Sequence, residues 1–263
     1  MFTIRASSLA ELFDCPARWE AKHLLRMSLP MGGAAALGKA VHASTAVFDR
    51  STILGVGITP DEAAAAAVDA IHKPDEDVAW DDDWQPASAE SVALALHHRY
   101  CRDIAPQQTY RAVEVQCDRL EISDLDLALT GSVDRLRETE DGAGIVDLKT
   151  CKTAVSADGV VQTKGHAYQM GVYELLAEAA SGIAITAPAQ IVAMQTGKTE
   201  RAQRIATAPI VGARGVLLGD IEQPGLLHTA SNLLRSGAFF GNPKSMTCHK
   251  AYCPRFDKCS FRR

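Results

Sequence analysis

The sequence lacks several features that would assign it to a class of protein at once. It contains no uninterrupted apolar run of membrane-spanning length, and its start, MFTIRASSLAELFDCPARWE, lacks the basic, apolar and small-residue order of a secretory signal. It has no internal repeat, no flexible linker and no G-x-x-x-x-G-K-[ST] phosphate loop. These absences argue against a membrane span and a helicase motor, and they favour a cytosolic protein.

The composition describes a soluble globular chain. Of its 263 residues, 47% are hydrophobic and 22% are charged, which is ordinary for a folded protein with a substantial core. The formal net charge of -5 argues mildly against nonspecific nucleic-acid binding. Charge is segregated, however: acidic residues gather in KPDEDVAWDDDW (73–84) and basic residues in the last twenty positions, so a local basic surface is compatible with the composition.

Apolar periodicity and turn residues predict the order of helices and strands. We expect helices over 7–25 (bent or divided at Pro16), 34–50, 60–73, 88–104, 165–180 and 215–237 (broken at Pro224), and strands over 109–122, 126–138, 144–150, 189–196 and 201–209. The pattern predicts a single α/β domain over 1–263. It comprises a mainly helical part (1–105), a core (106–240) and a terminal tail (241–263).

Two aspartates and a lysine interrupt neighbouring strands. Side chains alternate along a strand, so Ile145, Asp147 and Lys149 share one face, and the turn after Asp134 lets the two aspartates converge. Paired carboxylates repel each other unless a cation lies between them, and oxygen ligands favour Mg²⁺ or Mn²⁺. Such a site suits phosphodiester hydrolysis, in which the metal activates water and offsets phosphate charge. The alternative is a surface salt bridge between Asp147 and Lys149.

Polar residues also interrupt two predicted helices. His166, Gln169 and Tyr173 form a polar stripe on the helix that follows the strand pair, where a core-facing helix should be apolar. His42 interrupts the apolar face of the second helix. A lone histidine of this kind is usually a satisfied core or surface group, so His42 acquires meaning only together with the other residues.

Four short motifs, taken together, resemble the RecB-like branch of the PD-(D/E)XK nucleases. The order in that branch is G-x-x-x-H, G-x-[IV]-D, [DE]-x-K followed by Thr, and Q-x-x-x-Y. The sequence contains these as GKAVH (38–42), GSVD (131–134), DLKT (147–150) and QMGVY (169–173). The resemblance implies a restriction-endonuclease-like fold, with a mixed sheet core flanked by helices, a helical N-terminal subregion and a C-terminal Cys-rich segment.

The resemblance also implies residue roles. His42, Asp134, Asp147 and the backbone carbonyl of Leu148 would bind Mg²⁺ or Mn²⁺, Lys149 would be the catalytic lysine, and Gln169 and Tyr173 would contact DNA or support the site. Glu114 either lines the site or is an exposed strand residue, and the second option is slightly favoured. Phosphates could be held by Lys152, Lys164 or the basic tail.

The function that the resemblance implies is that of a metal-dependent deoxyribonuclease. It would be an exonuclease acting on single strands or DNA ends in recombination, repair or phage replication, alone or with a protein partner. The competing hypothesis is a non-catalytic DNA-binding or assembly subunit that retains the fold. An intact Asp134, Asp147 and Lys149 set argues against that alternative.

Seven cysteines in a cytosolic chain are expected to be thiols or metal ligands. Cys248, Cys253 and Cys259 crowd the C-terminus, and Cys15 stands alone near the N-terminus. The iron-sulfur branch of the RecB-like nucleases, which includes AddB nuclease domains and CRISPR-adaptation exonucleases, has this layout, and the resemblance implies a [4Fe-4S] cluster. The C-x4-C spacing departs from the usual C-x2-C and keeps structural Zn²⁺, with His249 as a ligand, as an alternative.

Two remaining features receive structural interpretations. Cys101, Cys117 and Cys151 are assigned to packing. The acidic segment 75–84 is expected to be a solvated loop, with DNA mimicry or partner docking as a minority alternative.

Overall fold

A central mixed sheet organises the chain. The computed structural model describes residues 1–262. The helices are α1 (Leu9–Asp14), α2 (Pro16–His23), α3 (Gly33–Ile53), α4 (Pro60–His72), α5 (Pro86–Arg99), α6 (Ala167–Ser181), α7 (Ala213–Leu218) and α8 (Leu226–Ser236). The strands are β1 (Phe2–Arg5), β2 (Met31–Gly32), β3 (Val78–Ala79), β4 (Thr109–Ile122), β5 (Leu127–Thr139), β6 (Gly142–Cys151), β7 (Ala189–Gln195) and β8 (Ile205–Ile210).

The main sheet has six strands, with the path β1-β5-β6-β7-β8 and with β4 paired to the other edge of β5. The β1–β5 and β6–β7 pairs are parallel, and the other pairs are antiparallel. The edge of β5 that faces away from β4 is divided: residues 127–130 pair with β1, whereas residues 135–139 pair with β6. Residues 131–134 therefore lie at a gap in the pairing.

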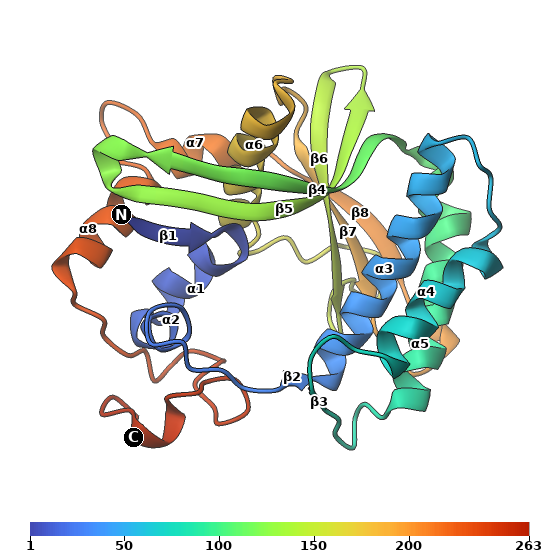
Figure 1. The fold of residues 1–263 in the computed structure, drawn as a ribbon, viewed down its shortest axis with the longest axis horizontal. Coiled ribbons are helices and arrows are strands. Elements are labelled where there is room, and N and C mark those ends of the chain that lie inside the picture. Colours follow the sequence, from blue (N-terminus) through green and yellow to red (C-terminus); the bar gives the residue numbers. More distant parts are fainter. Residues whose placement is uncertain (263) are drawn as a thin grey trace.

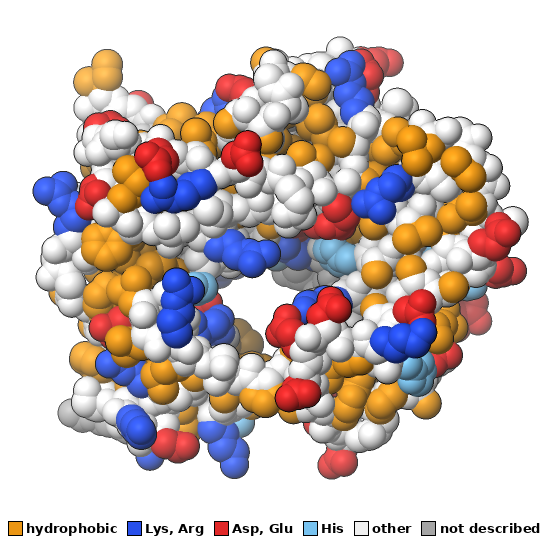
Figure 2. All heavy atoms as spheres, viewed as in Figure 1, with side chains coloured by type: hydrophobic (Ala, Val, Ile, Leu, Met, Phe, Trp, Pro, Cys, Tyr) orange, Lys and Arg blue, Asp and Glu red, His pale blue; other side chains and the backbone are white. Residues whose placement is uncertain are grey.

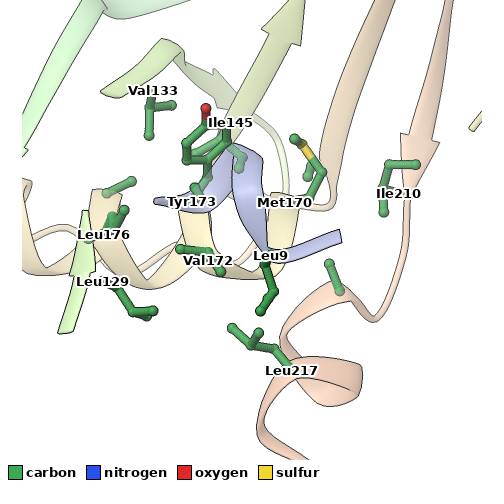
Figure 3. Packing of buried hydrophobic residues seen from close by; sticks show 14 of the residues in the cluster. Leu9, Leu129, Val133, Ile145, Met170, Val172, Tyr173, Leu176, Ile210 and Leu217 are labelled. Atoms are coloured by element: carbon green, nitrogen blue, oxygen red, sulfur yellow. The ribbon is translucent and has the colours of Figure 1, made fainter. Parts of the chain in front are cut away.

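Helices cover the two faces of the sheet and form two hydrophobic cores (Figure 1). On one face, Ile145 and Ile191 pack with Leu9 of α1 and with α6, α7 and α8. Figure 3 shows Met170, Val172 and Leu176 of α6 among Leu129, Val133 and Ile145. On the other face, Val146 and Leu148 pack with α3, α4 and α5. The alternation predicted for β6 is therefore confirmed.

Local sequence explains where several helices begin and end. Thr59 caps α4 by accepting a hydrogen bond from the Glu62 N–H, and the Glu62 carboxylate accepts one from the Thr59 N–H. Pro16 occupies the first turn of α2, where its missing N–H costs nothing, and it divides the 7–25 segment as predicted. Gly182, with a φ of 66°, ends α6.

Some elements differ from those predicted. β1 was not anticipated, because four residues of FTIR give too short a pattern to distinguish a strand. The 215–237 segment forms two separate helices on either side of Pro224. The chain after α5 continues as a π-helix over Tyr100–Ile104, and β8 begins at Ile205 rather than at 201.

Two segments without long helices or strands lie beside α1 and α2. Residues 24–30, here called the strap, run from α2 to β2, which pairs with β3 beside the α3–α5 layer (Figure 1). The residues after α8, here called the tail, pack against α1 and α2. Within residues 1–262, no helix combines the length and apolar character needed to cross a membrane.

Candidate active site

The gap in β5 pairing places Asp134 against β6. The ladder between these strands stops at Arg135 and Val146, so the next pair, Asp134 and Asp147, is where the strands separate. The Leu148 N–H, which has no partner from β5, donates instead to Asp134 Oδ2 at 2.8 Å. The two aspartates therefore meet at the start of the separation, as the sequence predicted, and Asp134 is fixed by the backbone.

His42 reaches the same point from α3. Its Nε2 donates to the Leu148 carbonyl at 3.0 Å, and its Nδ1 lies 3.6 Å from Asp134 Oδ2. One turn earlier, Gly38 lets the helix approach β6, because a Cβ there would lie 2.7 Å from Thr150 Oγ1. The spacing of GKAVH thus has a packing reason. Gly38 lets α3 lie close to β6, and at this short separation the His42 side chain reaches the Leu148 carbonyl.

Asp147 and Lys149 project from β6 on the face that holds Ile145. Lys149 Nζ lies 2.6 Å from Asp147 Oδ2 in an ion pair, yet this buried oxygen accepts no hydrogen bond of regular geometry. Burial raises the pKa of Asp147 to about 6, although Lys149 opposes the shift. A buried carboxylate oxygen without a hydrogen bond is well suited to a cation, so the surface salt-bridge interpretation is wrong: Asp147 is 2% exposed.

Glu114 joins this group from β4, although sequence reasoning favoured an exposed position. The register places it opposite Asp134, since Val113 pairs with Arg135 and Val115 with Val133. His42, Glu114 and Asp134 each offer a ligand atom within 4.8 Å of the others. Burial, and then the charge of Asp134, raises the pKa of Glu114. Glu114 has a φ of 52°, which nothing in the local sequence indicates. Only the pairing of β4 with β5 shows that its side chain lies in the site.

Electrostatics couples the imidazole to these carboxylates. Burial would lower the pKa of His42, but Asp134 and then Asp147 and Glu114 raise it above its ordinary value of 6.5. Burial would raise the pKa of Asp134, but His42 and the Leu148 N–H lower it to about 2. A proton on His42 thus balances the clustered negative charge, and a divalent ion would compete with that proton.

A buried arginine supports the site from behind. Arg135 is fully buried, and its guanidinium donates to Asp49 Oδ2 at 2.7 Å, to the Asp134 carbonyl at 2.8 Å and to Thr45 Oγ1 at 3.1 Å. Tyr100 donates a further hydrogen bond to Asp49 Oδ2 at 2.7 Å. The network ties α3 and the π-helix that follows α5 to the strand that carries Asp134. Sequence analysis missed it because a charged residue after Asp134 gives no signal of burial.

The polar stripe of α6 faces the site. Gln169 Nε2 donates to the Tyr173 hydroxyl at 2.8 Å, and both residues line the cleft described below. Gly131 permits the approach, because a Cβ there would lie 3.1 Å from the Tyr173 ring. Burial raises the pKa of Tyr173, which therefore stays a neutral hydroxyl at physiological pH. His166 begins the helix but is not among the residues that line the cleft.

These residues line one open cleft of about 970 Å³ between the sheet, α3 and the tail. Figure 2 shows an opening on this face, with Lys and Arg side chains along part of its border and acidic side chains along another. Arg5, on the unanticipated β1, lines the cleft, as does Lys152, whereas Lys164 is not among its lining residues. Asp83 also lines it and lies 3.8 Å from Lys152 Nζ.

The acidic segment is therefore only partly the solvated loop that was expected. It contains β3 and ends at Trp84, which is buried in the α3–α5 core. The packing interpretation holds for buried Cys101 and does not hold for Cys151, which is exposed and lines the cleft.

Cysteines from the two ends of the chain meet beside α2. Cys15, Cys248, Cys253 and Cys259 line one small pocket. The Asn242 N–H donates to Cys15 Sγ at 3.4 Å, and Arg18 Nε donates to the Tyr252 carbonyl at 2.9 Å, so the tail is bonded to the α1–α2 region. Burial raises the pKa of Cys253, and Cys15 and Cys259 lie close enough to add to the shift.

Comparisons with known proteins identify the family. The chain matches the family model described as the PD-(D/E)XK nuclease superfamily over residues 3–260. One similar solved structure, called "Crystal structure of SSO0001", is 13% identical, with 99% of this chain and 87% of that chain covered and a TM-score of 0.45. The search of curated proteins finds no match.

The family model and the geometry agree. The mixed sheet flanked by helices has the restriction-endonuclease-like architecture expected from the sequence. Members of this family are nucleases that use acidic residues to bind divalent metal ions, and His42, Glu114 and Asp134 form a group of that type. Because the family model spans nearly the entire sequence, the chain belongs to the PD-(D/E)XK nuclease superfamily.

Proposed function

We propose that the protein is a RecB-like deoxyribonuclease of the iron-sulfur branch, an exonuclease that acts on single strands or DNA ends. The observation that carries this proposal is the meeting of His42, Glu114, Asp134, Asp147 and Lys149 in one open cleft. A protein that only bound DNA would gain nothing from a buried carboxylate beside a lysine, because burial of charge is costly. Residues 1–263 act as one unit in this proposal, since both ends contribute to it.

The residues present fit a divalent ion. His42, Asp134, Asp147 and the Leu148 carbonyl would hold it, and Glu114 is added to the ligands that the motifs imply. The buried Asp147 carboxylate, whose charge only Lys149 offsets at 2.6 Å, and the oxygen-rich donor set suit Mg²⁺ or Mn²⁺. When bound, such an ion supplies Lewis acidity that polarises a phosphate oxygen and lowers the pKa of water.

The chain's own groups would then divide the remaining work. Lys149, paired with Asp147, carries a positive charge that would stabilise negative charge developing on the scissile phosphate or orient the attacking water. The neutral Tyr173 hydroxyl, held by Gln169, would donate to a phosphate oxygen. Arg5 and Lys152 would bind flanking phosphates along the cleft.

The four cysteines would hold a [4Fe-4S] cluster rather than zinc. In a tetrahedral zinc site with Zn–S of about 2.3 Å, thiolates lie about 4 Å apart. Among residues 1–262, no three cysteine sulfurs lie within 4.8 Å of one another, which favours a larger group. His249, the alternative zinc ligand, is exposed and is not among the residues lining the cysteine pocket. The cluster would join Cys15 to the tail and close the domain.

The test uses end-labelled single-stranded and double-stranded DNA with anaerobically purified protein in Mn²⁺, Mg²⁺ or EDTA. We expect metal-dependent cleavage that starts at ends, with single nucleotides or short products from the labelled terminus, and no cleavage in EDTA. Internal cleavage of circular single strands would contradict the exonuclease assignment. Absence of all cleavage by an iron-replete protein would favour the non-catalytic DNA-binding or assembly subunit.

A further inference from the structure

Beside the catalytic cleft lies a second cavity of about 390 Å³, under the strap. Its volume falls within the range of about 300–1,000 Å³ that is usual for small-molecule sites. Its walls combine apolar side chains, Met27, Leu29 and Pro254, with the cations Arg18 and Lys22. None of the four nuclease motifs contributes a residue to this cavity.

The cavity carries net positive charge. Arg18 and Lys22 share one carboxylate, Glu11, at 3.3 and 2.9 Å, and Glu11 is not among the residues that line the cavity. Burial would raise the pKa of Glu11, but the neighbouring His23, Lys22 and Arg18 lower it to about 2, so Glu11 stays ionised. Two cations against one anion leave a positive surface next to apolar walls. A nucleotide offers the matching pair of a phosphate and an apolar base face.

Tyr252 connects this cavity to the catalytic cleft. It lines both spaces, and 58% of its surface is exposed. Its backbone is held in place, since the carbonyl accepts from Arg18 Nε at 2.9 Å and the N–H donates to the His249 carbonyl at 2.9 Å. The residue belongs to the four positions between Cys248 and Cys253, which make the C-x4-C spacing two residues longer than the usual C-x2-C.

We propose that the strap cavity binds a nucleotide of the DNA single strand that occupies the catalytic cleft, with its base stacked on Tyr252. This inference rests on the proposed function and adds a subsite to it. An exposed aromatic ring fixed at its backbone is a stacking platform that accepts every base. A duplex hides the faces of its bases, so the subsite favours single strands. The longer cysteine spacing then serves to carry an aromatic residue from the tail to the substrate.

The experiment measures binding in a Lys149→Ala background, which removes cleavage. Fluorescence anisotropy with labelled oligothymidylates of about 4 and about 12 nucleotides compares strands that fill the cleft alone with strands that reach beyond it. We expect Tyr252→Ala to weaken binding of the long strand by about 5- to 150-fold, the range of one stacked base, and to weaken binding of the short strand much less, because Tyr252 only borders the cleft. Tyr252→Phe should retain the parent affinity.

Two further variants separate the subsite from a general defect in the tail. Met246→Ala alters a tail residue that is 96% exposed and lines none of these spaces, and it should bind like the parent. Lys22→Gln alters the cavity without touching the cysteine loop, and it should reduce the salt dependence of long-strand binding by about one phosphate contact. Iron content is measured for every variant.

The proposal is overturned if Tyr252→Ala and Lys22→Gln, both with parental iron content, bind the long strand as tightly as the parent. Equal losses on the short and long strands would also overturn it, because Tyr252 would then act within the cleft. If the parent binds neither strand, the proposed function itself fails, and this outcome is distinct from a selective loss.

Discussion

The catalytic cleft and the cysteine-bearing tail are held in place by different means. In the cleft, strand pairing and buried hydrogen bonds fix the candidate ligands. The Leu148 backbone contacts both Asp134 and His42, and the buried Arg135 side chain donates to the Asp134 carbonyl. In the tail, residues 237–262 contain only one short 3-10 helix, Phe256–Lys258, and individual hydrogen bonds to residues 14–20 hold this segment against α1 and α2.

The two regions differ in the interactions that keep them ordered. The cleft is preorganised by the protein, so a metal ion finds its ligands already placed. The tail has little regular backbone pairing, so its order depends on single hydrogen bonds to residues 14–20 and, under the proposed function, on the group that joins Cys15 to the three later cysteines. If that proposal holds, loss of the metal in the cleft changes chemistry, whereas loss of the cluster changes structure.

The largest effect is expected from breaking the tail. Cys253→Ser should abolish iron incorporation and expose residues 237–262 to protease, because structural metal groups contribute on the order of 10 kcal/mol to small sites. Iron analysis and limited proteolysis provide the measurement, and Cys151→Ser, an exposed cysteine of the cleft, is the control. Titration with Mn²⁺ should still show parental affinity at the cleft. Loss of that affinity would mean that the two regions are not independent.

The next effect comes from the support behind the cleft. Arg135→Met leaves Asp49 as a buried carboxylate without its cation, which should lower the free energy of unfolding by about 3–5 kcal/mol. Urea denaturation checks this. Adding Asp49→Asn should restore part of the loss, because the unpaired charge is removed. Arg119→Met, at an exposed position of β4, should cost under about 0.5 kcal/mol. Similar losses in both arginine variants would contradict the role of the network.

A purely chemical effect is expected at Lys149. Lys149→Ala should reduce cleavage by about 10²–10³-fold, the usual effect of removing a group that stabilises transition-state charge. Circular dichroism and iron content should remain parental, because Lys149 belongs to neither hydrophobic core and does not line the cysteine pocket. The control is Lys73→Ala, whose side chain is 77% exposed and is not among the residues lining the cleft, so it should matter little. Unchanged cleavage by the Lys149 variant would remove it from catalysis.

Metal affinity of the cleft should depend on pH. The pKa of His42 is raised above 6.5 and that of Asp147 to about 6, so protons held by these groups must leave when the ion binds. Affinity for Mn²⁺ should therefore fall as pH drops from about 8 to about 5.5, by up to tenfold per pH unit for each proton displaced. Calorimetric titration with Mn²⁺ in buffers of different ionisation enthalpy gives the number of protons released on binding. Affinity independent of pH would mean that the ion does not use these residues.

The smallest effect concerns the approach of α3 to β6. Gly38→Ala places a methyl group 2.7 Å from Thr150 Oγ1, so helix and strand must move apart at a cost of about 1–3 kcal/mol. His42 moves with the helix, and Mn²⁺ affinity should fall several-fold. Thr150→Ala removes the clashing atom, so the double variant should recover affinity. Gly32→Ala, where an added Cβ meets nothing within 4 Å, is the control.

Much of the fold and the motif geometry could be predicted from sequence. The alternation of Val146, Asp147 and Leu148 follows from strand periodicity, and the helix split at Pro16 follows from the missing amide of proline. His42 and Asp134 could be paired because four motifs occur in a fixed order. The roles of these residues, and the nature of the group at the cysteines, stay predictions that the experiments above test.

The remaining features depend on pairing that a single sequence does not encode locally. Glu114 enters the cleft because β4 pairs in a particular register with β5 and because its own φ is positive. Arg5 does so because four residues at the start of the chain add to an edge more than 120 positions away. Neither residue type nor spacing marks such positions, since their meaning arises only when distant segments come together.

The divided edge of β5 also constrains the order in which parts of the chain can fold. Residues 2–5 can pair only after residues 127–130 exist, and Cys15 meets its companions only after Cys259 has been made. At synthesis rates of about 5–20 residues per second, the start of the chain waits on the order of tens of seconds on the ribosome. Contacts this far apart in sequence slow folding. Residues 2–15 thus depend for their contacts on residues 127–130 and 248–259, which are synthesised much later.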